Sequence, residues 1–130
     1  AVQQAVPLMK EGGRIVGVSG FDSIRYLQNH GVLGAAKAAL EGLVRYWACE
    51  LALKNINVNG VCPGYVETDS AKVYSGDNWE KNVAQWSEKI PKGRLASPDE
   101  VASVIRFFCS PSSEYVTGQT LVVDGGMTIT

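Results

Sequence analysis

Three short runs of apolar residues alternate along this chain with longer segments of helical periodicity, and this alternation limits the possible folds more than any other feature. The runs are Ile15–Val18, Ile56–Cys62 and Thr120–Asp124. Strands that alternate with helices in this way indicate a parallel sheet covered by helices on both faces. The sequence therefore predicts an α/β fold.

The helical segments are marked by spacing and by end signals. Residues 1–10 have helical composition and stop at Gly12 and Gly13, because glycine commonly ends helices. Apolar residues recur at helical spacing from His30 to Leu53, which predicts one long amphipathic helix. Ser97-Pro98-Asp99-Glu100 combines a capping serine, a proline at the first helical position and the acidic residue of a capping box. A further helix is expected to begin there.

The polar segment 65–92 is the variable part of the chain. Trp79 and Trp86 lie seven residues apart in it, with Val83 between them, on an expected helix. They could line an acyl channel, face a partner or form part of the core. We leave these three interpretations open.

Composition and charge exclude several classes of protein. The 130 residues carry a net charge of -1 without a basic cluster, which argues against a nucleic-acid surface. No stretch approaches the roughly 18 apolar residues of a membrane-spanning helix. Cys49, Cys62 and Cys109 are far apart and His30 is the only histidine, so neither disulfides nor a metal site are expected. Buried thiols in the reducing cytoplasm are the simpler interpretation.

Two glycine motifs have structural explanations. Gly13, Gly17 and Gly20 are spaced like a phosphate loop, but Gly17 lies inside an apolar strand run. The motif acts only between a strand and a helix, so we do not expect phosphate binding there. Asp124-Gly125-Gly126 is interpreted as a structural strand end.

Five sequence blocks occur in a fixed order: Gly13-Arg14-Ile15-Val16, Gly34-Ala35-Ala36-Lys37-Ala38-Ala39-Leu40-Glu41, Asn57-Val58-Asn59, Pro63-Gly64-Tyr65-Val66-Glu67-Thr68 and Val123-Asp124-Gly125-Gly126. Together they resemble the second half of a short-chain dehydrogenase/reductase. The resemblance implies the C-terminal half of a Rossmann-type doubly wound parallel sheet. Residues 1–130 would then be a single partial domain, with the N-terminal dinucleotide-binding half upstream. We expect this stretch alone to be inactive and to bind a dinucleotide poorly.

Within that family, residues 21–30 leading to Lys37 are most similar to the enoyl-acyl carrier protein reductases. Their signature places six residues between the catalytic tyrosine and its lysine. Counting back from Lys37, this spacing gives His30, and the more usual spacing, with three residues in between, gives Leu33. Neither is a tyrosine. The family's catalytic serine falls near Ser19 or Gly20.

The resemblance assigns expected roles to four catalytic candidates. Lys37 would bind the nicotinamide ribose and stabilise negative charge, although an isolated helix lysine is usually solvated. His30, as a neutral imidazole, could donate an N–H to a thioester carbonyl that becomes an enolate, or it could simply be a polar residue at a helix start. Tyr26 could turn its hydroxyl into the cleft, and a half-buried loop aromatic is its simpler interpretation. Ser19 is the fourth candidate.

Cofactor contacts are expected where the middle strand ends. Ligands of α/β proteins bind at the carboxyl ends of parallel strands, and Pro63 and Gly64 end the run that begins at Ile56. By resemblance, the Val66 backbone would contact the nicotinamide carboxamide and the Thr68 hydroxyl a phosphate oxygen. The resemblance implies NADH or NADPH as the cofactor, and it places the residue that selects between the two upstream of this sequence.

The resemblance implies that the full-length protein reduces the double bond of an enoyl thioester carried by acyl carrier protein or coenzyme A, as in fatty-acid synthesis. Two alternatives stay open. One is a carbonyl or alcohol oxidoreductase of the same family, and the other is a non-catalytic member that lacks the tyrosine. Because such members pair through this helix, residues 30–53 are expected to form a homodimer or homotetramer contact.

Overall fold

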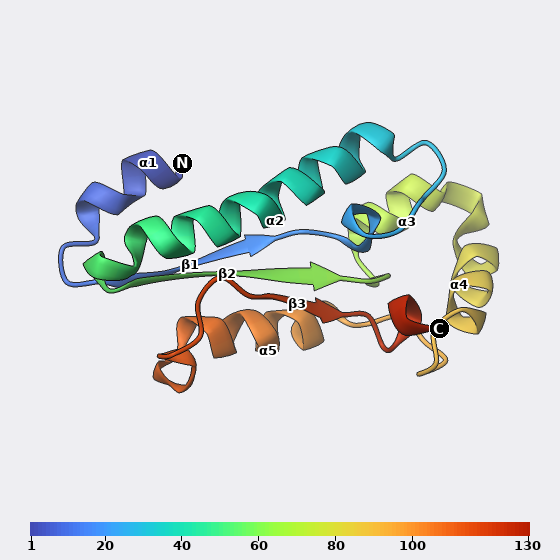
Figure 1. The fold of residues 1–130 in the computed structure, drawn as a ribbon. Helices are drawn as coiled ribbons and strands as arrows, with labels where there is room; N and C mark the ends of the chain where they lie inside the picture. Colours follow the sequence, from blue (N-terminus) through green and yellow to red (C-terminus); the bar gives the residue numbers. More distant parts are fainter.

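Three parallel strands form one sheet, as the apolar runs predict. In the computed structural model, which describes all residues 1–130, the sheet order is β1-β2-β3. β1 spans Gly13–Val18, β2 spans Ile56–Pro63 and β3 spans Thr120–Val123. β2 pairs with β1 from Ile56 to Val61 and with β3 from Gly60 to Pro63. The carboxyl ends of all three strands therefore lie at one edge (Figure 1).

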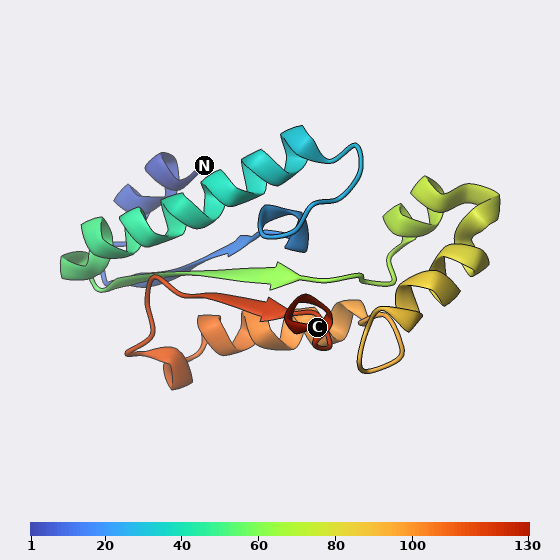
Figure 2. The ribbon, with the colours of Figure 1, turned by 45° about the vertical axis from the view of Figure 1, so that its right-hand side comes forward.

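Helices cover both faces of this sheet, which confirms the predicted α/β class. α2, Gly31–Leu51, lies on one face and α5, Pro98–Cys109, lies on the other (Figures 1 and 2). α3, Asp69–Ser75, and α4, Trp79–Glu88, extend beyond the carboxyl ends of the strands (Figure 2). The short α1, Val2–Ala5, lies beside α2. None of these helices combines the length and apolar character needed to cross a membrane.

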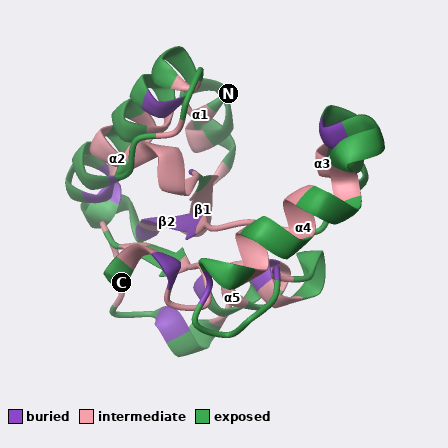
Figure 3. Cartoon of the chain, turned by 90° about the vertical axis from the view of Figure 1, so that its right-hand side faces the viewer, coloured by how far each residue is buried: buried purple, intermediate pink, exposed green.

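The core lies on both sides of β2. In the end-on view of Figure 3, buried residues gather around β2, whereas the outer faces of α2 and α5 are exposed. One cluster joins α2 to the start of β2, and a second joins α5 to its end. The first contains Val44, Ala48, Leu51, Ile56 and Val58, and the second contains Val61, Val101 and Phe108. Full burial of one such aliphatic side chain is worth about 1.5–3 kcal/mol.

Gly17 lies where α2 packs against the sheet. A Cβ atom at this position would lie 3.4 Å from side-chain atoms of both Leu40 and Val44, at the close end of ordinary van der Waals contact. Gly13 and Gly17 both lie inside β1. The glycine motif is therefore a packing feature of a strand and not a phosphate loop.

Two predicted helices end earlier than expected. The helix expected over residues 1–10 stops at Ala5 and continues only as a 3-10 turn over Val6–Leu8, because Pro7 lacks the N–H that an α-helix requires. The helix expected to end at Leu53 gives way to a 3-10 turn over Ala52–Lys54, after which Asn55 adopts a left-handed φ of 56°.

The expectation of three buried thiols is correct for one cysteine. Cys62 is buried in β2, whereas Cys49 and Cys109 are exposed. Burial raises the pKa of Cys62 to about 11, although a hydrogen bond with Ser23 opposes the shift. The Cys62 thiol therefore stays neutral. Cys49 and Cys109 lie on α2 and α5, on helix faces that do not pack against the core.

Candidate active site

The loop between β1 and α2 carries three of the four catalytic candidates. Ser19 follows β1 directly, and its N–H donates to the Val61 carbonyl at 2.7 Å. A 3-10 turn over Phe21–Ser23 then brings the chain against α2. The approach is close because a Cβ atom at Gly34 would lie 2.5 Å from the Asp22 carbonyl oxygen. The absence of a side chain at Gly34 therefore allows the loop to pack directly against α2.

This contact predicts a difference between two glycines of α2. Gly34→Ala is expected to destabilise the complete protein by about 1–2 kcal/mol, because the clash with the Asp22 carbonyl exceeds the gain in helix propensity. Gly42→Ala is the matched control, since its Cβ would meet only Arg45 Nη2 at 3.9 Å. It is expected to be neutral or to stabilise by about 0.5–1 kcal/mol. Denaturant unfolding of both variants measures the difference, and equal effects would contradict the contact.

A carboxylate of α2 binds the two serines of this loop. Ser19 Oγ and Ser23 Oγ each donate to Glu41 Oε1 at 2.6 Å. Ser19 is only 5% exposed, and a hydroxyl has a single proton to donate. In this arrangement the Ser19 proton is committed to Glu41 and is not offered to a bound molecule.

Lys37 lies at the carboxyl edge of the sheet. Its Nζ atom donates to the carbonyl of Val18, the last residue of β1, at 3.0 Å. An ammonium has three N–H donors, and the other two have no acceptor within the chain. They are therefore free to bind hydroxyl or carbonyl oxygens of a molecule at this edge.

His30 directly precedes α2 and lies beside a carboxylate that the sequence analysis did not identify. Its Nδ1 atom is 3.3 Å from Asp22 Oδ2. The imidazole is 27% exposed and the Asp22 side chain only 9% exposed. Nε2 has no hydrogen-bond partner within the chain. The ring is thus held at one nitrogen and available at the other.

Tyr26 does not match its simpler interpretation. Its side chain is 89% exposed, so it is not a half-buried loop aromatic. It borders two cavities, one of about 250 Å³ shared with His30 and Asp22, and one of about 410 Å³ shared with Phe21 and Tyr65. The loop positions Tyr26 at the rim of these cavities because Arg25, its neighbour, is bound to the carbonyls of Met127 and Thr130.

Pro63 and Gly64 end β2 against the end of β3. Pro63 pairs with Val123, and the Gly64 N–H donates to the Val123 carbonyl at 3.0 Å. A Cβ atom at Gly64 would lie 2.7 Å from the Cβ of Asp124. Only glycine permits this approach, which turns the chain toward Val66 and Thr68 at the edge of the sheet.

Val66 and Thr68 present unused polar groups at this edge. Val66 forms a bridge with Ala96, but the hydrogen bonds of that bridge are made by Tyr65 and Glu67. The Val66 N–H and C=O therefore have no partner. Thr68 caps α3, and its Oγ1 atom accepts from the Ala71 N–H at 3.1 Å. The Thr68 hydroxyl proton remains free to donate.

Aromatic residues from distant segments pack beside this edge. The Tyr65 ring lies 4.8 Å from that of Phe21 and stacks on Trp86 at 4.6 Å, and Trp79 meets Trp86 at 6.1 Å. Burial raises the pKa of Tyr65. Both tryptophans pack against a buried cluster that contains Ile90, and neither lines the 410 Å³ cavity. The structure therefore supports the core interpretation of the tryptophans.

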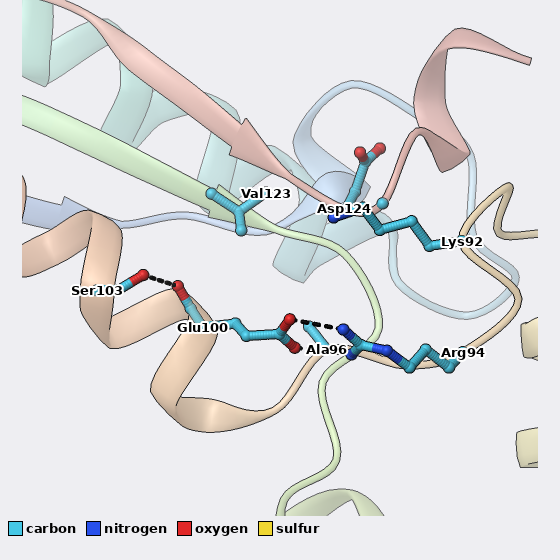
Figure 4. A pocket seen from close by; sticks show the side chains of 8 residues that line it. Lys92, Arg94, Ala96, Glu100, Ser103, Val123 and Asp124 are labelled. Atoms are coloured by element: carbon cyan, nitrogen blue, oxygen red, sulfur yellow. Dashed lines mark hydrogen bonds and ion pairs between the residues drawn. The ribbon is translucent and has the colours of Figure 1, made fainter.

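A polar cavity of about 240 Å³ lies between α5 and the end of β3 (Figure 4). Arg94 donates to both carboxylate oxygens of Glu100 at 2.8 and 2.7 Å. This bond, with that from the Ser97 N–H, lowers the pKa of Glu100 to about 2. Ser97 Oγ accepts from the Glu100 N–H, so the predicted capping box is confirmed. Arg94, Glu100 and Ser97 thus hydrogen-bond to one another, so few of their donors and acceptors are available to a ligand.

Asp124 borders the same cavity, and its carboxylate points away from the Arg94–Glu100 pair (Figure 4). It accepts from the N–H groups of Gly126 and Thr128 at 2.9 and 2.7 Å. Burial opposes ionisation, but these hydrogen bonds outweigh it and lower the pKa of Asp124. Asp124 therefore holds the turn after β3, as its interpretation as a strand end predicts.

No group of three or more His, Cys, Asp or Glu side chains is arranged to hold a metal.

Comparison with known proteins identifies the family. A short chain dehydrogenase family protein from Francisella tularensis superposes with a TM-score of 0.90 and 27% identity, over 99% of this chain and 56% of that one. A family model described as enoyl-(acyl carrier protein) reductase matches residues 1–128. The chain belongs to the short-chain dehydrogenase/reductase family. The resemblance seen in the five sequence blocks is thereby confirmed.

Relatives within the short-chain dehydrogenase/reductase family act on different substrates. The chain is 42% identical to 1-cyclohexenylcarbonyl-CoA reductase of Streptomyces collinus, over 98% of this chain and 45% of that protein. It is 40% identical to 3-oxoacyl-[acyl-carrier-protein] reductase of Thermotoga maritima, over 98% and 51%. The chain thus spans about half the length of these relatives.

A solved family member with a bound cofactor has the same fold. It is a gluconate 5-dehydrogenase from Burkholderia cenocepacia in complex with NADP and tartrate, with a TM-score of 0.91 and 28% identity over 99% of this chain and 51% of that one. The Rossmann-type arrangement predicted for a short-chain dehydrogenase/reductase is therefore confirmed for the residues present.

Proposed function

We propose that the complete protein is a cytoplasmic reductase of the double bond of an enoyl thioester, with NADH or NADPH as hydride donor. The observation that carries this proposal is the position of His30. It directly precedes the first residue of α2, and Lys37 lies seven residues later, in the second turn of that helix. One ring nitrogen of His30 is free, and Lys37 has two free N–H donors at the strand edge.

The residues at the carboxyl edge fit a nicotinamide cofactor. The free Val66 N–H and C=O match the two polar groups of a carboxamide, and the free Thr68 hydroxyl can donate to a phosphate oxygen. Lys37 can bind ribose hydroxyls with the donors that Val18 leaves unused. When bound, the cofactor supplies a hydride to the substrate. The residues of this chain orient the cofactor, and His30 supplies the proton.

The acyl group has a candidate cavity beside the aromatic cluster. The cavity of about 410 Å³ combines apolar and aromatic side chains with Glu88 and Lys89 at its border. Phe21, Leu27, Tyr65 and Met127 supply its apolar lining. The relative from Streptomyces collinus is named as a reductase of a coenzyme A thioester, and we extend that substrate class to this protein.

Substrate comparison with the complete protein tests this function. Oxidation of the reduced cofactor is measured with crotonyl thioester and with acetoacetyl thioester, and we expect faster oxidation with crotonyl thioester. Turnover of acetoacetyl thioester alone would favour the carbonyl reductase, an alternative supported by the 3-oxoacyl reductase relative. No oxidation with either substrate would favour a non-catalytic member.

The proposal also includes assembly through α2. Leu43 and Tyr46 are 43% and 72% exposed on this helix, and Leu53 beyond its end is fully exposed. Because such an apolar surface is unfavourable in water, we expect the complete protein to be a dimer or tetramer. Tyr46→Glu should weaken this assembly in light scattering, whereas Glu50→Gln on the same helix should not. A wild-type monomer at micromolar concentration would contradict the proposal.

A further inference from the structure

Asp22 and His30 form an isolated pair. The Asp22 side chain is 9% exposed, and its carboxylate has one hydrogen-bond partner, His30 Nδ1, at 3.3 Å. A buried carboxylate without a hydrogen-bond donor is unfavourable. The pair therefore favours a proton on Nδ1, with Asp22 as the acceptor.

This arrangement fixes which nitrogen of His30 can act on a substrate. With a proton on Nδ1, the neutral ring has an unprotonated Nε2, which accepts hydrogen bonds and cannot donate them. Only the doubly protonated ring can donate from Nε2. The earlier expectation of a neutral imidazole as donor therefore changes, because Asp22 already takes the one N–H that a neutral ring has.

Asp22 is the anionic group that faces His30. The other titratable groups around the two cavities bordered by His30 are Arg25, Tyr26 and Tyr74, the last from α3. The Arg25 guanidinium is bound to two C-terminal carbonyls. Asp22 is the one carboxylate at these two cavities, and replacing it removes the opposite charge beside the ring.

We propose that Asp22 is a positioning residue that holds His30 through Nδ1, so that the doubly protonated ring delivers its Nε2 proton to the substrate. This inference rests on the proposed function. As hydride from the reduced nicotinamide forms a bond at the β-carbon of the enoyl thioester, the π electrons move to the thioester oxygen. The enolate then takes the Nε2 proton at its α-carbon, which leaves saturated thioester, oxidised cofactor and a neutral His30 still bonded to Asp22. Solvent restores the proton.

The test uses Asp22→Asn in the complete protein. Turnover at neutral pH is expected to fall about 10-fold, the lower end of the loss seen when a carboxylate that orients a metal-binding histidine is removed. The decline of turnover with rising pH should begin at lower pH than in the wild type, because the neutral ring is favoured. Asp77→Asn, in the exposed turn before α4, is the matched control and should leave the pH profile unchanged.

A second comparison separates positioning from a structural role. In a His30→Tyr background, Asp22→Asn should not lower turnover, since a phenol needs no partner at Nδ1. An equal loss in both backgrounds would show that Asp22 acts through the fold and would overturn the inference.

Nuclear magnetic resonance of isotope-labelled histidine gives a readout that does not depend on activity. The His30 signals are identified by their absence in His30→Gln. Asp22→Asn should move the His30 titration to lower pH, and an unchanged titration would overturn the inference. If the wild type does not reduce an enoyl thioester but Asp22→Asn still shifts the His30 titration, the result contradicts the proposed function alone.

Discussion

His30→Ala is expected to lower the turnover of an enoyl thioester by about 100-fold or more in the complete protein, the scale observed when a donor to a developing oxyanion is removed. The physical reason is that, in the proposed mechanism, His30 supplies the proton to the developing enolate. The Ser19 proton is bound by Glu41 at 2.6 Å, and Tyr26 is 89% exposed. Steady-state kinetics with crotonyl thioester measures the loss, and cofactor binding should change little.

His30→Tyr combined with Asp22→Ser is the matched control for this prediction. The double variant restores a tyrosine at the family spacing and removes a carboxylate that would otherwise be buried without its partner. It should preserve or raise enoyl reduction. Near-normal turnover of His30→Ala would contradict the assignment and would make Tyr26 or a bound water the donor to test. Failure of both variants and of the wild type would favour the non-catalytic alternative.

Lys37→Ala is expected to lower kcat/KM by about 100-fold or more, and in contrast to His30→Ala it should also weaken cofactor binding. In the proposed mechanism the ammonium binds the ribose hydroxyls and also stabilises the negative charge that develops on the substrate. It also anchors the carboxyl end of β1 through its bond to the Val18 carbonyl. Kinetics combined with a cofactor-binding titration separates these effects.

Lys54→Ala provides the control for Lys37, since Lys54 is an exposed lysine in the turn after α2. It should leave both measurements unchanged. A Lys37→Ala enzyme that binds cofactor as tightly as the wild type would show that the lysine does not contact the ribose.

Much of the fold could be predicted because the relevant patterns are local. The apolar run from Ile56 is one strand to within a residue, and the capping box at Ser97 begins a helix at Pro98 as predicted. Because the strands are parallel, all their carboxyl ends lie at one edge of the sheet. The loop from Pro63 to Thr68 could therefore be located without coordinates.

The pairings within the site could not be predicted, because they depend on contacts between distant segments. Asp22 is eight residues from His30, and Ser19 is 22 residues from Glu41. Both pairs form because Gly34 lets the loop lie against α2. The position of Glu41, four residues after Lys37, does indicate a shared helix face, but not which side chains it binds.

α2 therefore joins the candidate catalytic residues in one continuous element. It carries Lys37 and Glu41 in one continuous helix, and His30 precedes its first residue. The same helix exposes Tyr46 on its outer face. Under the proposed function and assembly, a neighbouring subunit that shifts α2 would move His30, Lys37 and Glu41 together. Contact between subunits would then influence the reaction rate, so that an effector binding between subunits could tune the reaction without entering the cleft.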